Sequence, residues 1–344
     1  MGILHILVAS GALALISIGM RVKIWAAAWL MIVIGWSASA WAAPGWPASL
    51  TIGTASPGGV YLFYGNTLAP LLTEAVGIPV STRATQGPDQ NILLLESGKV
   101  QLAFVTTGSA LQAWNGTASW THGKKLRSMR ALFPMYNTPF QFVALDSSGI
   151  SILRDMGNKQ VGVGPQGGTG GLYANKIFEV LGIPAAVQYG AWSTMSRQMR
   201  SGVLDAIVGT AGAPFPVITG LDGTEKIRFI PLNDNEIAKL QKAVPEFSPS
   251  VVPAGTYPSL NSDYKTIGLF NFAVASKDLP ADLAYSVVKA FYANHDQLVE
   301  ATSAARESVA ANVDRDTFIP YHPGALRYYR EIGVELPAAV AAPQ

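Results

Sequence analysis

The stretch GVGPQGGTGG, residues 162–171, has the residue types and spacing of a phosphate-binding loop. Its first six residues fit the G-x-G-x-x-G pattern, in which glycines let the backbone approach a dinucleotide. The segment KQVGVG before it predicts a strand, and the segment GLYANKIFEVLG after it predicts a helix. The next strand, however, ends in Gln188 and Tyr189 where an acidic residue is required, and Pro165 lacks the N–H that a pyrophosphate needs. We therefore expect no nucleotide cofactor.

No other catalytic or metal-binding pattern occurs in the sequence. Neither G-x-x-x-x-G-K-[ST] nor G-x-S-x-G is present, and no histidine lies in a loop that pairs it with an obvious nucleophile. The four histidines lie far apart, without metal-ligand spacing: His5, His122, His295 and His322. We expect a protein that is not an enzyme, binds no metal and carries no cofactor.

The glycine-rich design occurs twice. The segment LTIGTASPGGVYLFYGNTLAPLLTEAVGIPV starts at Leu50, and KQVGVGPQGGTGGLYANKIFEVLGIPAAV starts at Lys159. Each predicts a short strand, a Gly-rich loop and an amphipathic helix that ends at Gly77 or Gly182. A second element repeats as SGKVQLAFVTTG, residues 97–108, and SGVLDAIVGTAG, residues 201–212. Two related α/β halves follow, each with parallel strands covered by helices.

Two long segments predict strands that cross between these halves. They are LFPMYNTPFQFVALDSSG, residues 132–149, and YKTIGLFNFAVASKD, residues 264–278. Two crossing strands indicate two doubly wound lobes joined by a two-strand hinge. We assign 43–140 and 260–344 to lobe I and 141–259 to lobe II. The helical patterns after residue 278 are expected to pack back on lobe I.

Both glycine-rich loops are expected beyond the carboxyl ends of strands, where open α/β sheets bind ligands. Each loop leads into a helix whose first N–H groups are free and whose dipole is positive at that end. Ser56 and Thr169 can cap these helices or bond a ligand. Facing loops from two lobes would clasp one small anion, and closure would exclude water.

The first 42 residues read as an export signal. They contain no Asp or Glu, and a basic segment, MRVK at 20–23, leads into an apolar run that ends in Ala40-Trp41-Ala42. This order is typical of a secretory signal peptide cleaved near Ala42, with translation starting at Met20. A two-helix membrane anchor is the competing interpretation. Removal of 1–42 lowers Lys+Arg from 24 to 22, equal to the 22 Asp+Glu, so nothing suggests a nucleic-acid partner.

An ordered set of motifs resembles a known family. LTIGTASPGGVYLFYG, SGKVQLAFV, AWNGTASW, VGVGPQGGTG, VPAGTYP and HPGALRYYREIG are similar to the TAXI-type solute receptors of TRAP transporters, over nearly all of the mature chain. The resemblance implies a type II periplasmic binding-protein fold, a periplasmic location and a TRAP-type membrane permease as partner. It also implies a small organic anion as ligand, of the glutamate, 2-oxo acid or dicarboxylate class.

The resemblance carries over several ligand-binding loops, and Tyr136 and Tyr189 are added because both lie in polar segments beside the expected cleft. The expected ligand contacts are Ser56, Gly58, Gly59, Val60, Tyr61, Thr85, Gln86, Thr106, Thr107, Tyr136, Gln166, Gly168, Thr169, Gly170, Tyr189 and Thr210. Where the family commonly has Gln, then Ser or Asn, then Asp, this chain has Thr106 and Thr107. The loss of a carboxylate there disfavours an amino-acid ligand and favours a purely anionic one.

Two alternatives stay open at this point. A bilobed binding protein also serves as a ligand sensor that presents a carboxylate to a membrane signalling kinase. Arg83, in STRATQG, would pair a ligand carboxylate if it faced the cleft, but its place on a strand also allows it to point to solvent.

Overall fold

The computed structural model describes residues 45–315 and 318–341, so the expected signal peptide lies outside the described residues. The first half of the fold contains three parallel strands in the order β2-β1-β3. Its strands are β1 (Leu50–Gly53), β2 (Val80–Arg83) and β3 (Leu102–Thr106), and its helices are α2 (Val60–Val76), α3 (Pro88–Glu96) and α4 (Thr107–Asn115). Each strand is followed along the chain by a helix, and a glycine-rich loop separates β1 from α2, as the repeated sequence pattern predicts.

The second half repeats this arrangement with three parallel strands in the order β7-β5-β6. The parallel strands are β5 (Gln160–Gly162), β6 (Ala186–Gln188) and β7 (Ala206–Thr210), and a fourth strand, β8 (Ile227–Phe229), lies outside this parallel set. The helices of this half are α5 (Thr169–Leu181), α6 (Trp192–Arg200), α7 (Pro216–Asp222) and α8 (Asp234–Ala243). The helices α2 and α5 both end in left-handed glycines, Gly77 with φ 73° and Gly182 with φ 67°. The expected C-caps are therefore confirmed.

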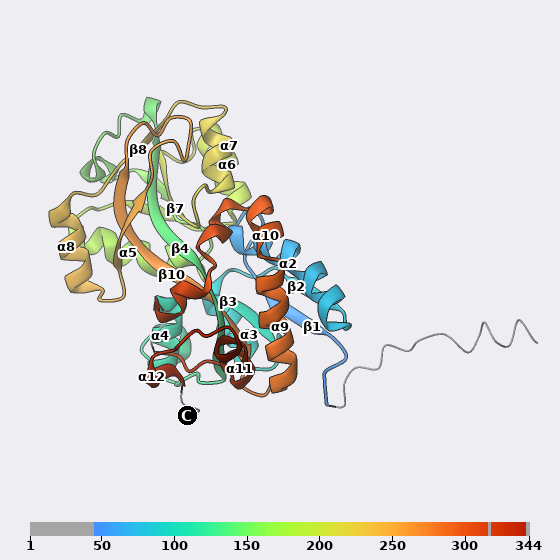
Figure 1. Ribbon diagram of the computed structural model, residues 1–344. Helices are drawn as coiled ribbons and strands as arrows, with labels where there is room; N and C mark the ends of the chain where they lie inside the picture. The colour runs from blue at the N-terminus through green and yellow to red at the C-terminus, as the bar shows by residue number, and fades with distance from the viewer. Residues whose placement is uncertain (1–44, 316–317, 342–344) are drawn as a thin grey trace, which may run out of the picture. The chain divides into compact units, whose positions relative to one another are not determined.

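Two long antiparallel strands join the halves, β4 (Met129–Leu145) and β10 (Tyr264–Ser276). They run side by side from one group of elements to the other (Figure 1). Strand β10 also pairs with β3 and with β9 (Ser248–Val252), whereas β4 pairs with β7 and β8. Within the described part of the chain, the result is one mixed ten-stranded sheet, in which the central antiparallel pair separates two parallel sets.

The C-terminal helices return to the first half. They are α9 (Ala281–Ala293), α10 (His295–Ala301), α11 (Pro323–Glu331) and α12 (Ala338–Ala341). Helix α9 packs against α2, and α11 packs against α9. The Phe133 and Phe291 rings stack with centroids 3.7 Å apart and fix α9 on β4. This agrees with the helical pattern read after residue 278.

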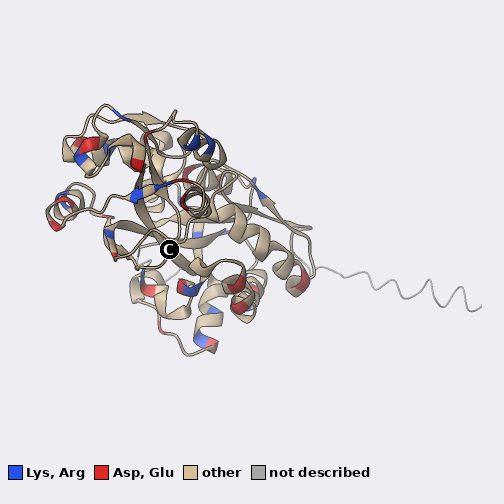
Figure 2. Ribbon diagram, turned by 90° about the horizontal axis from the view of Figure 1, so that it is seen from above, with Lys and Arg blue, Asp and Glu red and all other residues tan. Residues whose placement is uncertain are grey.

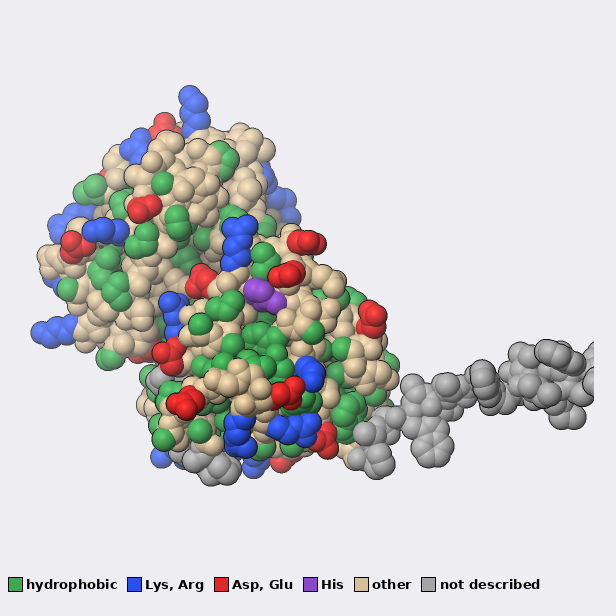
Figure 3. All heavy atoms as spheres, in the orientation of Figure 1, with side chains coloured by type: hydrophobic (Ala, Val, Ile, Leu, Met, Phe, Trp, Pro, Cys, Tyr) green, Lys and Arg blue, Asp and Glu red, His purple; other side chains and the backbone are tan. Residues whose placement is uncertain are grey.

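The buried hydrophobic residues form two clusters. One includes Tyr64, Phe104 and Phe133 and extends to Trp192 and Phe215 of the second half. The other contains Phe140, Tyr173 and Phe247 of the second half. Charged residues of both signs are interspersed along the ribbon (Figure 2), and their side chains are scattered over the face drawn in Figure 3. In the described part of the chain, no helix has the length and apolar character needed to cross a bilayer.

Candidate functional site

A small cavity of about 40 Å³ opens between the loops of the two halves, at the carboxyl ends of their strands. Its walls are neutral, because no Asp, Glu, Lys, Arg or His occurs among its eighteen lining residues. They are Ala55, Ser56, Gly59, Val60, Tyr61, Gln86, Gly87, Pro88, Tyr136, Thr138, Val163, Pro165, Gly168, Thr169, Gly170, Trp192, Thr210 and Ala211. Any ionic selectivity of this cavity therefore comes from the backbone and from hydroxyl and amide groups.

Three helices begin at the cavity wall. Helix α2 starts after Gly59, α3 after Gly87 and α5 after Gly168. Neither Gly59 nor Gly168 has a capping side chain, and neither α2 nor α5 has an acidic residue in its first turn. The N-cap residues are therefore the two glycines, Gly59 and Gly168, and neither Ser56 nor Thr169 caps a helix with its side chain. The first N–H groups of such helices lack intrahelical acceptors, and the positive dipole ends favour an anion between them.

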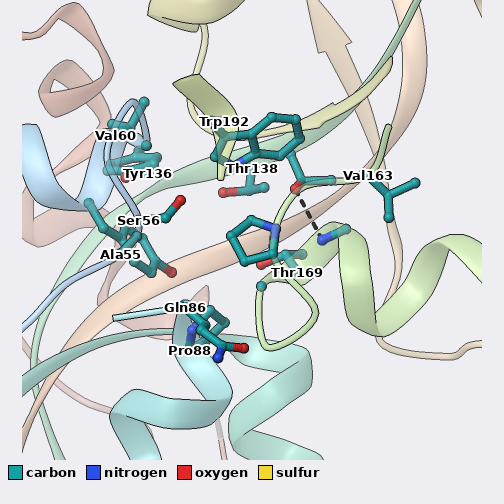
Figure 4. A pocket seen from close by; sticks show the side chains of 18 residues that line it. Ala55, Ser56, Val60, Gln86, Pro88, Tyr136, Thr138, Val163, Thr169 and Trp192 are labelled. Carbon is teal, nitrogen blue, oxygen red and sulfur yellow. Dashed lines mark hydrogen bonds between the residues drawn. The ribbon is translucent and has the colours of Figure 1, made fainter. Parts of the chain in front are cut away.

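Two buried hydroxyl groups in the cavity wall have no hydrogen-bond partner among the described residues, Ser56 Oγ and Tyr136 Oη. Ser56 is 7% exposed and Tyr136 is 0% exposed. Both hydroxyls lie on the wall formed by the first half and by the crossing strand β4 (Figure 4). Burial raises the pKa of Tyr136 well above its ordinary value, so its hydroxyl keeps the proton and remains a donor. An unpaired buried hydroxyl costs about 1–3 kcal/mol, which a ligand acceptor would offset.

The opposite wall is built by the second half. Gly170 N donates a hydrogen bond to Thr210 Oγ1 at 3.1 Å, which ties the start of α5 to the end of β7 (Figure 4). The Trp192 ring packs edge-on against Phe215 with centroids 5.1 Å apart. Gly164 has φ +84°, and a Cβ atom there would lie 2.5 Å from the Trp192 ring. This loop therefore requires glycine for its conformation and for the close approach of the indole.

The structure brings ten of the sixteen sequence-predicted residues to the cavity wall. They are Ser56, Gly59, Val60, Tyr61, Gln86, Tyr136, Gly168, Thr169, Gly170 and Thr210. The Tyr61 hydroxyl, however, is already bonded to Asn271 Oδ1. Of the ten, Ser56 and Tyr136 have fully buried side-chain donors that lack a partner in the described structure.

The other six predicted residues lie outside the wall, and most have another role. Thr85 Oγ1 donates to Thr54 O, Thr106 caps α4, and Thr107 Oγ1 donates to Phe270 O at 2.7 Å. Gly58 adopts φ +90° beside the start of α6. Gln166 is exposed, and Tyr189, 44% exposed, accepts a hydrogen bond from Asn175. Arg83 is also exposed, on β2.

Several wall residues are missing from the sixteen expected contacts, above all Trp192 and Thr138. The sequence places Trp192 on or beside the cleft, but Tyr136 and Tyr189 are preferred as ligand contacts because they lie in polar segments. Trp192 is the first residue of α6, directly after the turn that follows β6, so the carboxyl-end rule applied to β6 would have included it. Thr138 lies in the middle of β4 and accepts a hydrogen bond from Asn271 Nδ2 at 2.7 Å. No local sequence signal marks a mid-strand threonine as a wall residue.

Within 45–315 and 318–341, no group of three His, Asp or Glu side chains is placed to hold a metal ion. The His322 ring instead caps α11, because Nδ1 accepts a hydrogen bond from Gly324 N at 3.2 Å. Burial lowers the pKa of His322 to about 4, so this ring is neutral near pH 7.

Comparison with known proteins agrees with this architecture. The periplasmic binding protein BugD is 12% identical, with a TM-score of 0.55 over 85% of this chain and 99% of that one. MatC from Rhodopseudomonas palustris, solved with bound malate, is 10% identical, with a TM-score of 0.56 over 78% and 93% of the two chains. These similarities establish the fold of periplasmic solute-binding proteins. Residues 52–333 match the NMT1-like family, and the chain belongs to that family.

Proposed function

We propose that the protein is a non-enzymatic solute receptor that captures one small organic anion in the cavity between its two halves. The observation that carries the proposal is a pair of buried hydroxyls, Ser56 Oγ and Tyr136 Oη, that have no hydrogen-bond partner among the described residues and lie in a wall where helices begin. A carboxylate accepts from such donors with charge-assisted hydrogen bonds worth about 1.5–3 kcal/mol each. Each helix dipole adds roughly 0.3–1 kcal/mol.

The wall chemistry favours an acid without an amino group. A ligand ammonium would find no carboxylate among the lining residues, whereas a second carboxylate or a 2-oxo group would find hydroxyl donors. Within the expected class of glutamate, 2-oxo acids and dicarboxylates, we therefore rank 2-oxo acids and dicarboxylates first. One water molecule needs roughly 10–15 Å³ of cavity volume, so a cavity of about 40 Å³ holds only a few ligand atoms unless its walls move.

The proposed partner is a TRAP-type permease, and the proposed location is the periplasm after export. The motif set that resembles TAXI-type receptors supports both, together with the fold of periplasmic solute-binding proteins. A periplasmic sensor that presents the same ligand to a membrane kinase is the alternative. Co-purification from membranes would separate them, because a receptor copurifies with permease subunits and a sensor with a kinase.

Titration calorimetry of the mature chain tests the binding proposal directly. We expect saturable binding of malate or 2-oxoglutarate, weaker binding of glutamate, and no binding of putrescine, a diamine control. Malate is a reasoned probe because MatC was solved with it. Binding of putrescine but of no carboxylate would overturn the proposal. The Ser56→Ala, Tyr136→Phe double variant should lose the carboxylate signal while its unfolding midpoint stays near that of the parent chain.

A further inference from the structure

A polar cluster outside the cavity joins the two halves. Gln112 lies on α4 of the first half, Tyr173 lies on α5 of the second, and Glu246 precedes β9. Gln112 Nε2 donates to Tyr173 Oη at 3.1 Å and to Glu246 Oε1 at 3.2 Å. Tyr173 Oη donates to Glu246 Oε1 at 2.9 Å. One amide therefore bonds two side chains of the opposite half at once.

The second-half side of this cluster is held rigidly. Tyr173 is 2% exposed, and its ring packs against Phe140 and Phe247 with centroids 6.3 and 5.0 Å away. Burial raises the pKa of Tyr173 well above its ordinary value, so the hydroxyl keeps its proton and remains a donor to Glu246. Gln112 thus meets a preformed acceptor pair, which lowers the entropy cost of the contact.

Glycine at position 108 makes the approach sterically feasible. A Cβ atom on Gly108 would lie 2.0 Å from Tyr173 Oη and 3.3 Å from Glu246 Cγ. Gly108 is in the first turn of α4, and its φ lies outside the positive range, so its conformation does not require glycine. Glycine there costs roughly 0.5–1 kcal/mol relative to alanine in helix stability. The close approach of Tyr173 therefore accounts for glycine at position 108, which helix formation alone would disfavour.

We propose that Gln112, Tyr173 and Glu246 form a latch that holds the two halves closed and sets how long a solute stays bound. The inference rests on the proposed function, because it assumes that closure traps the solute. None of the three residues lines the cavity, so they act on the solute through closure and are positioning residues. Gly108 is the fourth member, because its missing side chain allows the latch to form.

The latch is tested first without any solute, by measuring the distance between the halves. The chain has no cysteine, so a spin label attaches only where a cysteine is introduced. We place one label in each half, at the exposed positions Lys99→Cys and Lys242→Cys, and measure the distance between them. Gln112→Lys gains an ionic contact with Glu246 and should raise the closed population. Gln112→Glu adds a like charge and should lower it. Asn115→Lys and Asn115→Glu, at the exposed end of the same helix, are the matched controls.

Gly108→Ala is the steric test. It should shift the label distances toward the open form while the unfolding midpoint stays the same or rises, because alanine favours the helix. Adding Tyr173→Phe removes the atom nearest the new methyl group and should restore part of the closed population. Identical distance distributions in all these chains, or shifts of the same sign for Gln112→Lys and Gln112→Glu, would overturn the latch.

Malate kinetics then separate the latch from the proposed function. Gln112→Glu should speed malate dissociation about tenfold or more, because it removes both hydrogen bonds that the amide donates, with little change in association. Gln112→Lys should slow dissociation. If the parent chain binds no malate while the label distances still follow the expected order, the ligand proposal fails and the latch stands. If malate binds and all dissociation rates are equal, the latch fails and the receptor stands.

Discussion

The hydroxyl of Tyr61 donates a hydrogen bond to Oδ1 of Asn271, 2.5 Å away on the crossing strand β10. Asn271 Nδ2 in turn donates to Tyr136 O and to Thr138 Oγ1. The rings of Tyr61 and Tyr136 lie edge to face with centroids 6.3 Å apart. The two neighbouring tyrosines therefore have different roles. The Tyr61 hydroxyl bonds to strand β10 through Asn271, whereas the Tyr136 hydroxyl has no partner among the described residues.

This contrast gives opposite predictions for the two phenylalanine variants. Tyr136→Phe should weaken malate or 2-oxoglutarate binding about tenfold or more without loss of stability, because it removes an unpaired donor. Tyr61→Phe should leave affinity close to the parent value and lower the free energy of unfolding by about 1–3 kcal/mol, because Asn271 Oδ1 loses its donor. Calorimetry and urea unfolding measure the two quantities. Equal losses of affinity in both variants would contradict the assignment.

The local parts of the site were predictable from the sequence. The loops at 56–59 and 166–168 follow strands and precede helices, so the pattern alone places them at the carboxyl edge of the sheet. The fold class followed from the same repetition together with the two crossing strands.

Non-local packing decided the rest. Tyr189 follows β6, an edge strand, and points to Asn175 rather than to the cavity. Thr107 bonds to Phe270 of β10, 163 residues along the chain. Gln112 and Glu246 are 134 residues apart, and neither has a neighbouring signal that announces their contact. Such pairs depend on the way in which two halves meet, which hydrophobic periodicity does not encode.

Asn91 should be a major contributor to the stability of the first half. It is 0% exposed, its Nδ2 donates to Thr54 O and Phe104 O, and its Oδ1 accepts from Thr85. Asn91→Ala removes three buried hydrogen bonds, although Thr54 O keeps the bond from Thr85 Oγ1, and it should lower the free energy of unfolding by about 2–4 kcal/mol. The matched control is Asn175→Ala, an exposed asparagine, which should change it by less than about 0.5 kcal/mol. A small effect for Asn91→Ala, measured by urea unfolding, would show that water replaces these bonds.

Nucleotides should not bind despite the G-x-G-x-x-G pattern. Strand β6 ends at Gln188, which supplies no carboxylate for a ribose, and the Trp192 ring packs directly on Gly164 of the loop. A pyrophosphate would need the space that this indole occupies. Calorimetry of the parent chain with NAD and with ATP should give no binding heat under conditions in which malate does. A micromolar dissociation constant for either nucleotide would contradict this prediction.

Two buried titratable residues should give the stability opposite dependences on pH. Burial raises the pKa of Asp89 from its ordinary value of 3.8 to about 7, and a hydrogen bond with Ser109 lowers it by less. Burial lowers the pKa of His322 from 6.5 to about 4. Between about pH 4 and 7 the native chain keeps the Asp89 proton that the unfolded chain releases, so this residue destabilises the fold as pH rises. Over nearly the same range, the unfolded chain protonates His322 and the native chain does not, so that residue destabilises the fold as pH falls.

Removing either residue should therefore reveal the pH dependence of stability that the other contributes. Relative to the parent chain, Asp89→Asn should gain roughly 3–4 kcal/mol of unfolding free energy between about pH 4 and 7, since one pKa unit corresponds to about 1.4 kcal/mol. His322→Asn, which keeps a side-chain acceptor to cap α11, should lose roughly 3 kcal/mol relative to the parent over the same rise in pH. Urea unfolding at several pH values gives each difference, in which the contributions of all other groups cancel. Differences that stay constant with pH in both variants would mean that neither residue is held in its neutral form by burial.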